Sequence, residues 1–297
     1  MRVMISGASG LLGTALTRGL QSDGHETVAL VRRIPREGEV QWDPRQPLDP
    51  AKLAGCDGVV HLAGKNIAGR WTERFKQEVL ESRTVTTRTL ATATADSFRR
   101  TGQPRVFVSA SGVGYYGNRG DEVLTEQSAV GTGFLSEVCK QWEAAAAPAR
   151  EAGVRVVNLR IGVVLARDGG ALKPMLLPFQ LGLGGRIGSG QQWWSWVALE
   201  DVIGAMRFAL QTDGLQGGVN VVAPAPVRCA EFVKALGRVL HRPTIFPLPE
   251  FVIRTVMGEM GKELLLTSAC AMPEKLQGTD YQFRHADLDG ALRAALK

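Results

Sequence analysis

A strand-like run followed directly by regularly spaced glycines and an amphipathic helix constrains this fold more than any other feature. Residues 3–6 are apolar enough for a buried strand, a helix is predicted over 11–21, and a second strand over 27–31. The glycines between the first strand and the helix, in the spacing GxxGxxG, are Gly7, Gly10 and Gly13. Glycines in this place within a βαβ unit predict a dinucleotide-binding turn.

The surroundings of the motif matter, because the same spacing occurs twice more in a chain with 35 glycines. The match that starts at Gly114 is followed by two acidic residues, which would repel a phosphate, and the match that starts at Gly182 opens no helix. A helix N-terminus offers free N–H groups and the positive end of a dipole to a pyrophosphate. The alternative for the first turn is a tight turn that binds no ligand. The predicted cofactor contacts at this turn are Gly7, Ser9, Gly10, Leu11, Leu12 and Gly13.

The end of the second strand selects the cofactor. Folds that prefer NAD usually place an acidic residue there for the ribose 2′-hydroxyl, whereas an arginine accommodates the 2′-phosphate of NADP. Here the strand ends at Arg32 and Arg33, and the next acidic residue is Glu37. Two guanidinium groups fit a phosphate through forked, charge-assisted hydrogen bonds, so we predict NADP(H). The alternative is that both arginines are solvated surface residues.

Alternation of apolar runs with helical stretches continues to about residue 165 and predicts an α/β fold. Near-continuous apolar strands between helices indicate a Rossmann-like, doubly wound parallel sheet covered on both faces. Further strands are expected over 40–42, 58–62, 105–109, 154–159 and 219–222, and helices over 72–99, 133–152, 199–211, 230–240, 251–257 and 288–296. We expect an NADP-binding domain over 1–240, with a substrate-side segment over 166–240. A small mixed C-terminal appendage is expected over 241–297.

Composition excludes several classes of protein. The chain has 297 residues, 44% of them hydrophobic, which is too many for a disordered chain. Its formal net charge of +6 comes from basic residues interleaved with acidic ones, so nucleic-acid binding is not supported. No apolar run is long enough for a membrane span, and the four cysteines and four histidines have no metal-ligand spacing. We expect no leader peptide, no metal, reduced thiols, a cytoplasmic location and a small-molecule substrate, while the oligomeric state is left open.

Three stretches resemble the short-chain dehydrogenase/reductase superfamily, in its extended, epimerase-like branch. They are residues 6–13, residues 57–64, and residues 108–111 together with Tyr116 and Gly117. The chain is still more similar to an atypical subgroup of epimerase family proteins that carries a C-terminal domain of unknown function. The stretches typical of that subgroup are 115–117, 142–143, 179–196 and 220–226.

The resemblance implies further cofactor contacts. Leu62, Ala63 and Gly64 would lie beside the adenosine or its ribose at the end of the fourth strand, and Gly162 and Val164 would flank the nicotinamide. Glu78 and Arg83 lie on the long helix predicted over 72–99, which follows the fourth strand. From this helix Arg83 could reach the cofactor. His61 is expected to be a hydrogen-bonded structural histidine rather than a catalytic one.

The catalytic pattern of the superfamily is missing. Most members use Tyr-x-x-x-Lys, in which the tyrosine moves the substrate proton and the lysine lowers its pKa. None of the three tyrosines here has a lysine four residues later. Phe134 or Leu135 falls at the tyrosine position, and Lys140 lies close to the lysine position but out of register. The remaining catalytic candidates are Ser109, Ser111, Tyr116 and Lys140, against loop packing for Tyr116 and a solvated helix face for Lys140.

A glycine-rich loop from Gly182 to Gly190, followed by Trp193, Trp194 and Trp196, is the expected substrate wall, with core tryptophans as the alternative. Two functions remain open at this point. The first is NADP(H)-dependent redox or epimerase-like chemistry on a small carbonyl or sugar-nucleotide-like substrate. The second is a non-catalytic NADPH-binding module that senses redox state.

Overall fold

Seven parallel strands form one central sheet in the computed structural model, which describes residues 1–297. Ser6 of β1 (Arg2–Ser6) pairs with Leu30 of β2 (Glu26–Val31) and with His61 of β4 (Gly58–His61). His61 in turn pairs with Ser109 of β5 (Val106–Gly112). The carboxyl ends of these strands therefore meet at one edge, which is where an open α/β sheet binds ligands. In spatial order the strands are β12 (Gly217–Val221), β7 (Arg155–Ile161), β5 (Val106–Gly112), β4 (Gly58–His61), β1 (Arg2–Ser6), β2 (Glu26–Val31) and β3 (Glu39–Gln41).

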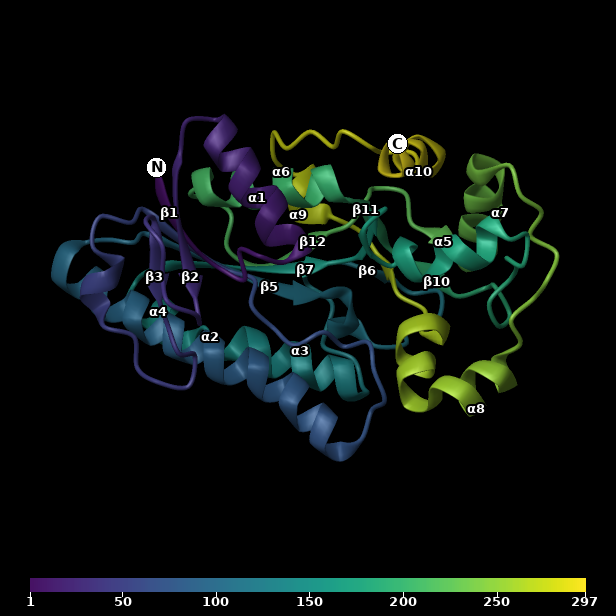
Figure 1. The fold of residues 1–297 in the computed structure, drawn as a ribbon, viewed down its shortest axis with the longest axis horizontal. Coiled ribbons are helices and arrows are strands. Elements are labelled where there is room, and N and C mark those ends of the chain that lie inside the picture. Colours follow the sequence, from purple (N-terminus) through teal and green to yellow (C-terminus); the bar gives the residue numbers. More distant parts are fainter.

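Helices cover both faces of this sheet, which confirms the Rossmann-like, doubly wound fold (Figure 1). On one face lie α1 (Leu11–Ser22) and α6 (Leu199–Gln211), and on the other lie α2 (Glu73–Thr101), α3 (Phe134–Ala144) and α4 (Ala147–Glu151). Alternate residues of β1 serve the two faces, since Val3 and Ile5 join one buried cluster and Met4 joins the other. Burial on both faces explains why the strands are apolar throughout rather than alternating.

The boundaries of the long helices follow from local chemistry. The hydroxyl of Thr72 accepts a hydrogen bond from the Phe75 backbone N–H and caps α2, and Gly102 ends it in the left-handed conformation with φ 74°. The single helix predicted over 133–152 is two helices, α3 and α4. Proline is tolerated only near a helix start, and Pro148 lies in the first turn of α4.

The second half of the chain carries a nine-residue helix that the sequence pattern missed. The glycine-rich segment over 169–190 contains α5 (Leu172–Gln180). Pro174 lies in its first turn, but Pro178 lies inside it, so the sequence looks like a loop. Two α-helices, α7 (Cys229–Leu240) and α10 (Leu288–Leu296), match their predicted ranges closely.

The remaining elements, apart from the 12-residue helix α8, are short, and most lie in the second half. They are η1 (Pro50–Leu53), η2 (Val113–Tyr116), β6 (Val123–Leu124), β8 (Val163–Ala166), β9 (Gly169–Gly170), β10 (Trp193–Trp194), β11 (Trp196–Ala198), β13 (Val227–Arg228), α8 (Glu250–Gly261), the π-helical turn η3 (Lys262–Leu266), β14 (Cys270–Ala271) and α9 (Glu274–Gln277).

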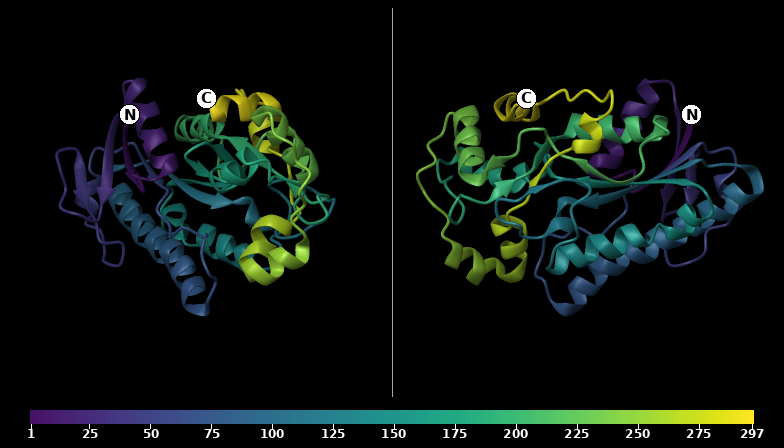
Figure 2. Two further views of the ribbon diagram at one scale, coloured as in Figure 1. Left: turned by 45° about the vertical axis from the view of Figure 1, so that its right-hand side comes forward. Right: turned by 180° about the vertical axis from the view of Figure 1, so that it is seen from behind.

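The C-terminal residues share a hydrophobic core with the segment that precedes them. Leu165, Trp196 and Phe232 lie in one buried cluster with Ile253 and Leu292. Figure 2 shows α8 curving round to the N-terminal end of α2, across the edge where the central strands end. No helix is long and apolar enough to cross a membrane.

Candidate functional site

The three glycines of the first turn form a cradle in which Gly7 and Gly13 have no room for a side chain. Gly7 has φ +75°, and a Cβ on it would lie 2.8 Å from the backbone nitrogen of Ala63. A Cβ on Gly13 would lie 2.2 Å from the carbonyl oxygen of Gly7. The turn is closed by a hydrogen bond from the Gly10 N–H to that same oxygen, at 3.0 Å. The structure therefore brings the predicted residues Leu62 and Ala63 against the cradle.

The helix that starts at this cradle leaves its N-terminus open. Gly10 is the N-cap residue of α1 without a capping side chain, and no acidic residue lies in the first turn. Ser9 is exposed beside it, Leu11 packs against Gly169, and Leu12 packs on the core. Unpaired N–H groups and the positive dipole end make this a site for an anion such as a pyrophosphate.

The two arginines at the end of β2 have different surroundings. Arg33 donates two hydrogen bonds to the carboxylate of Glu39, at 2.7 and 2.5 Å, and this pairing lowers the pKa of Glu39. Arg32 is exposed and makes neither an ion pair nor a side-chain hydrogen bond. Of the two, Arg32 is the guanidinium that remains available for a 2′-phosphate.

Two more predicted contacts lie on α2, and the structure separates them. Glu78 is paired with Lys65 and with Arg74, whose Nε lies 3.0 Å away, and these cations lower its pKa. Arg83 instead turns toward the loop after β4, where a Cβ on Gly64 would lie 3.3 Å from its Cζ. Gly64 and Arg83 therefore adjoin the cradle, while Glu78 is engaged by the two basic side chains.

Two predicted nicotinamide neighbours lie where β7 ends and β8 begins. Gly162 lies between these strands, and a Cβ on it would lie 2.2 Å from the carbonyl oxygen of Ser195. Val164 is half-buried and packs against the central core. Gly162 is thus required by a close approach of the chain, independently of any cofactor.

A chain of polar side chains lies behind the end of β5. The Ser111 hydroxyl donates to the Glu143 carboxylate at 2.9 Å. Arg160 of β7 holds that carboxylate through two hydrogen bonds, at 2.8 and 2.9 Å. The exposed fraction is only 6% for the Arg160 side chain and 13% for that of Glu143, so the pair is well shielded. Ser109 lies deeper, fully buried, with its hydroxyl donating to a backbone carbonyl, so the structure does not bring it to the surface of the site.

The two adjacent tyrosines, Tyr115 and Tyr116, differ in their burial and in the hydrogen bonds of their hydroxyl groups. Tyr116 is fully buried, and its hydroxyl lies 2.7 Å from the Asn220 side-chain oxygen and accepts from Arg160 at 3.0 Å. Burial raises the pKa of Tyr116. Tyr115 is half-buried, makes no hydroxyl hydrogen bond, and lies with its ring 3.5 Å from the Arg160 guanidinium carbon. This geometry favours an internal, positioning part for Tyr116 and leaves Tyr115 as the phenol with a free hydroxyl.

Comparison with known proteins decides the family. A model of the NAD dependent epimerase/dehydratase family matches residues 3–223, and a model of a domain of unknown function, DUF1731, matches residues 248–295. The chain belongs to the NAD dependent epimerase/dehydratase family. The resemblance predicted from its motifs is thereby confirmed.

Several relatives of this epimerase-family chain are known. Epimerase family protein Mb2239 of Mycobacterium bovis is 44% identical over 293 residues, covering 98% of this chain and 96% of the relative. The crystal structure of human epimerase family protein SDR39U1 with NADPH has a TM-score of 0.89 and 37% identity, covering 100% and 99% of the two chains. A nucleoside-diphosphate sugar epimerase from Corynebacterium glutamicum has a TM-score of 0.82 at 37% identity, although this chain covers 58% of it.

The epimerase-family chain carries neither tyrosine nor lysine on the helix face that meets the site. A Cβ on Gly114 would lie 3.2 Å from Leu135 and 3.9 Å from the sulfur of Cys139, so these two residues, four apart on α3, line the loop after β5. Lys140, one residue further, is exposed and lies 3.7 Å from Glu137. One residue turns a helix by about 100°, so Lys140 faces solvent and its predicted ribose contact finds no support. Of the two residues considered for the tyrosine position, it is Leu135 that faces the site.

The predicted substrate wall of tryptophans is mostly core. Trp194 packs edge-on against Phe232 and is 5% exposed, and Trp196 is fully buried with its indole N–H bonded to the Ala225 carbonyl. Only Trp193 is half-exposed, beneath the Arg228 guanidinium. The expectation that these residues line the substrate is thus wrong for Trp194 and Trp196, because apolar burial fixes them.

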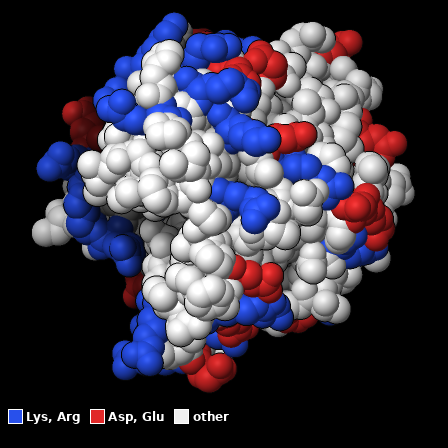
Figure 3. All heavy atoms as spheres, turned by 90° about the vertical axis from the view of Figure 1, so that its right-hand side faces the viewer, with Lys and Arg blue, Asp and Glu red and all other residues white.

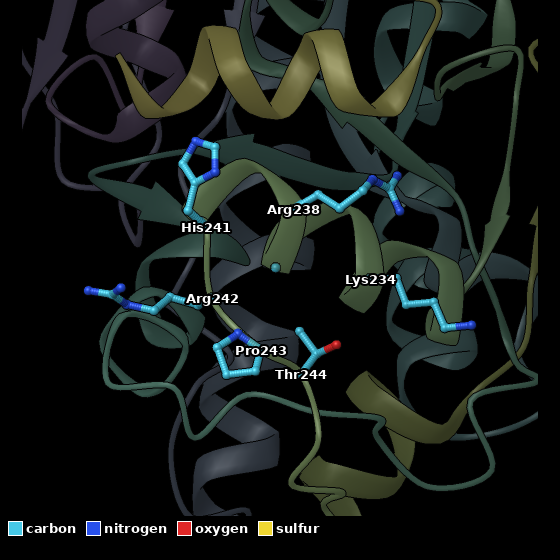
Figure 4. Close-up of a pocket in the computed structure, with 7 residues that line it drawn as sticks. Lys234, Arg238, His241, Arg242, Pro243 and Thr244 are labelled. Atoms are coloured by element: carbon cyan, nitrogen blue, oxygen red, sulfur yellow. The ribbon is translucent and has the colours of Figure 1, made fainter.

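A hollow of about 600 Å³ lies at the end of α7, but it is not built as a binding site. Its cationic side chains point in different directions (Figure 4). Arg238 is paired with Asp289, and Arg242 donates to the backbone oxygen of Gln180. On this end of the molecule basic side chains are interspersed with acidic ones around an uncharged area (Figure 3).

Sequence reasoning missed Glu143, Arg160 and Asn220 as parts of the site. Glu143 and Asn220 fall in stretches typical of the subgroup, which was the available signal. Nothing in the sequence marked Arg160 as a site residue. It is a charged residue within an apolar strand, and its partner, Glu143, lies on another element. A segment at the far end of the chain joins the same network, since Met272 accepts from the Asn220 side chain and Lys275 donates its backbone N–H to Glu126.

His61 is the structural histidine that the sequence predicted. Its Nδ1 lies 2.5 Å from the Ser6 hydroxyl and its Nε2 lies 3.1 Å from that of Thr86, and the side chain is fully buried. Burial, and to a smaller extent the charge of Arg83, lower the pKa of His61 to about 3. The imidazole is therefore neutral in the folded protein near neutral pH.

This pKa predicts acid sensitivity with a definite sign. Between pH 6.5 and 3 the unfolded chain binds a proton at His61 that the folded chain does not, so stability falls as the pH is lowered through this window. The contribution is about 1.4 kcal/mol per pH unit. Urea unfolding between pH 4.5 and 8 measures how the free energy of unfolding changes with pH. The slope of this free energy against pH should be shallower for His61→Gln than for the wild type, whereas exposed His241→Gln should keep the wild-type slope. Equal slopes for His61→Gln and the wild type would contradict the assignment.

Proposed function

We propose that this chain is an NADP(H)-binding oxidoreductase or epimerase-like enzyme that acts on a small carbonyl or sugar-nucleotide-like substrate without the usual Tyr-x-x-x-Lys pair. One observation carries the proposal. At the end of β5, the Ser111 hydroxyl donates to a carboxylate that Arg160 holds in place. The four cysteines are buried and unpaired, which is consistent with a cytoplasmic protein.

The residues at the first turn fit a dinucleotide. The cradle has room only because Gly7 and Gly13 lack a Cβ, and the N-terminus of α1 faces it without a capping side chain. Arg32 is free to meet a 2′-phosphate. The NADPH in the crystal structure of the human relative supports the choice of cofactor for this chain.

NADPH, when bound, supplies a hydride to the carbonyl carbon, and the carbonyl oxygen must then take up one proton to give the alcohol. The Ser111 hydroxyl can give its proton to that oxygen and recover one through Glu143, whose carboxylate must first take up a proton from solvent. Arg160 fixes the carboxylate and keeps it in register with Ser111. Tyr116 and Asn220 hold Arg160 and the loop from behind, and Tyr115 offers a second hydroxyl.

The first experiment separates enzyme from binding module. NADPH fluorescence titration should give a micromolar Kd, and a panel of carbonyls and nucleotide sugars should then yield substrate-dependent NADPH oxidation that Ser111→Ala reduces by at least tenfold. Epimerisation would leave the cofactor unchanged in net terms, so product chromatography must accompany the oxidation assay.

A second function, a non-catalytic NADPH-binding sensor, is favoured by Leu135 and Cys139 at the face of α3 that meets the site. Neither residue can move a substrate proton at neutral pH, since burial raises the pKa of the Cys139 thiol to about 11. Tight NADPH binding with no turnover across the whole panel would select this function.

Replacing Arg32 tests the cofactor assignment. Hydrogen bonds to charged groups contribute about 1.5–3 kcal/mol, so Arg32→Gln should weaken NADPH binding by roughly ten- to a hundredfold and leave NADH binding unchanged. Arg45→Gln, an exposed arginine beyond the strand, serves as the charge-matched control. An unchanged preference for NADPH over NADH in Arg32→Gln would refute the assignment.

A further inference from the structure

Most of the large apolar side chains that this protein leaves in solvent lie in two segments, 177–183 and 245–256. Eight of the twelve exposed large hydrophobic side chains belong to these segments. They are Leu177, Leu181, Leu183, Ile245, Phe246, Leu248, Phe251 and Val256, with exposed fractions from 37% to 77%. Single exposed apolar residues are normal on a protein surface, but a gathering of this kind marks a surface that meets something other than water.

The two segments lie against each other. Backbone bridges join Gly185 to Ile245 and Ile187 to Leu248, and α8 follows directly after the second bridge. In Figure 1 the chain from α7 to α8 runs along the right-hand edge of the molecule, away from the central sheet. The eight side chains therefore belong to one surface, which we call the apolar face.

The backbone of residues 243–249, at the centre of the apolar face, offers few free hydrogen-bond donors. Three of these seven residues are prolines, which have no N–H: Pro243, Pro247 and Pro249. The N–H groups of Phe246 and Leu248 already donate to the carbonyls of Gly184 and Arg186, at 3.2 and 2.8 Å. Because an unpaired N–H is costly in a lipid layer, this segment can leave water at a lower cost than an ordinary loop.

The free charges around the apolar face are basic. Within the stretches 172–190 and 241–262 the acidic residues are Glu250 and Glu259, and each of them is already in an ion pair, at 2.6 and 3.1 Å. The exposed basic side chains of these stretches that have no ion pair are Lys173, Arg186, Arg242 and Lys262. Figure 3 looks onto this end of the molecule and shows an uncharged area with basic side chains on either side of it.

This charge pattern distinguishes between two occupants of the apolar face. In a twofold contact with a second copy of the chain, the same surface is used by both copies, so the same basic side chains would meet one another. An anionic lipid surface would instead attract them. Apolar side chains flanked by lysine and arginine are typical of protein surfaces that lie in the membrane interface.

We propose that the apolar face is a peripheral membrane-binding surface. Phe246, Phe251 and their apolar neighbours enter the headgroup region of a bilayer, and Lys173 and Arg186 bind the phosphates and carboxylates of anionic lipids. No residue of the candidate site takes part in this contact, so the inference goes beyond the proposed function and does not depend on it.

Co-sedimentation with lipid vesicles tests the apolar part of the proposal. Phosphatidylcholine vesicles that contain about one third phosphatidylserine should bind the wild-type protein at least tenfold more tightly than pure phosphatidylcholine vesicles, and added salt should weaken this binding. Phe246→Ser with Phe251→Ser should lower the affinity for the mixed vesicles at least tenfold. The matched control is Val85→Ser with Val123→Ser, which removes two exposed apolar side chains elsewhere and should change nothing.

Neutralising the basic side chains tests the electrostatic part. Each basic residue near an anionic membrane contributes roughly a fivefold gain in affinity, so Lys173→Gln with Arg186→Gln should weaken binding to the mixed vesicles at least tenfold. Arg45→Gln with Arg88→Gln removes two exposed arginines elsewhere on the protein and should keep wild-type binding.

Several results would overturn the proposal: no binding of the wild-type protein to the mixed vesicles, equal binding to both kinds of vesicle, or the same loss in a control as in its test variant. A wild-type dimer in analytical ultracentrifugation that Phe246→Ser with Phe251→Ser converts to a monomer would assign the apolar face to a second copy instead. Circular dichroism must show that each variant is folded. Should the first pair fail to fold, Phe251→Ser with Val256→Ser replaces it, since these side chains are 69% and 77% exposed, and the same loss is expected.

Discussion

Replacing Glu143 with alanine is expected to lower the free energy of unfolding by about 3–5 kcal/mol. The reason lies in the partner left behind. Arg160 is shielded from water, and it would lose a carboxylate that now holds it through two hydrogen bonds. Ser111 would lose its acceptor at the same time. Urea unfolding followed by circular dichroism measures the change directly.

Glu137→Ala is the matched control, because Glu137 lies on the same helix and meets only exposed partners, Lys140 at 3.7 Å and the Gln141 side-chain amide at 2.9 Å. Its expected effect is less than about 0.5 kcal/mol, as for other surface ion pairs. The double variant Glu143→Leu with Arg160→Met removes both charges and should be markedly more stable than Glu143→Ala. A Glu143→Ala protein as stable as Glu137→Ala would show that the pair is not shielded as described.

Gly13→Ala is expected to abolish tight NADPH binding, with a loss of at least a hundredfold in affinity. Gly13 has ordinary helical dihedral angles, so the effect comes from space and not from backbone strain. Its new Cβ would lie 2.2 Å from the Gly7 oxygen and 2.6 Å from the Ala8 Cα, both main-chain atoms that cannot swing aside. The turn must open, which moves Gly7 and Gly10 away from the positions that form the cradle.

Fluorescence titration with NADPH provides the measurement, and Gly214→Ala provides the control, since a Cβ on Gly214 meets nothing within 4 Å. Overpacking also costs stability, about 1–3 kcal/mol, so the titration is performed well below the unfolding midpoint. Retention of wild-type affinity in Gly13→Ala would place the cofactor elsewhere than on this turn.

Local patterns predicted the fold well because the inner strands of the sheet are buried on both faces and the longest helix has its own cap and end. Thr72 and Gly102 delimit α2 by contacts within a few residues, so their roles are visible in the sequence. Helix α5 was missed for the opposite reason. Pro178 lowers its intrinsic helicity, and packing against the rest of the chain holds it together.

The candidate site shows the same difference between features set by neighbouring residues and features set by contacts between distant elements. The glycine cradle is contained in one βαβ unit and could be found from spacing and context. The Arg160–Glu143 pair joins a strand and a helix, and only the assembled sheet brings the two residues together. A shift of one residue along the helix decides whether Lys140 faces the site or solvent. Sequence spacing alone does not fix this register, and in the structure Lys140 is exposed.

The segment from Ser268 to Lys275 has a consequence for how the protein is made. Ser268 bonds to the loop at Asn118 and Gly120 and to the backbone of Trp193, and β14 pairs with β6. The contacts with Asn118, Gly120 and β6 span about 150 positions, so a chain that emerges from the ribosome in order completes its central sheet before the loop behind Tyr116 has its last partners. Such late, non-local closure is slow compared with helix formation. The loop behind Tyr116 is therefore expected to gain its last contacts only after residues 268–275 have been synthesised.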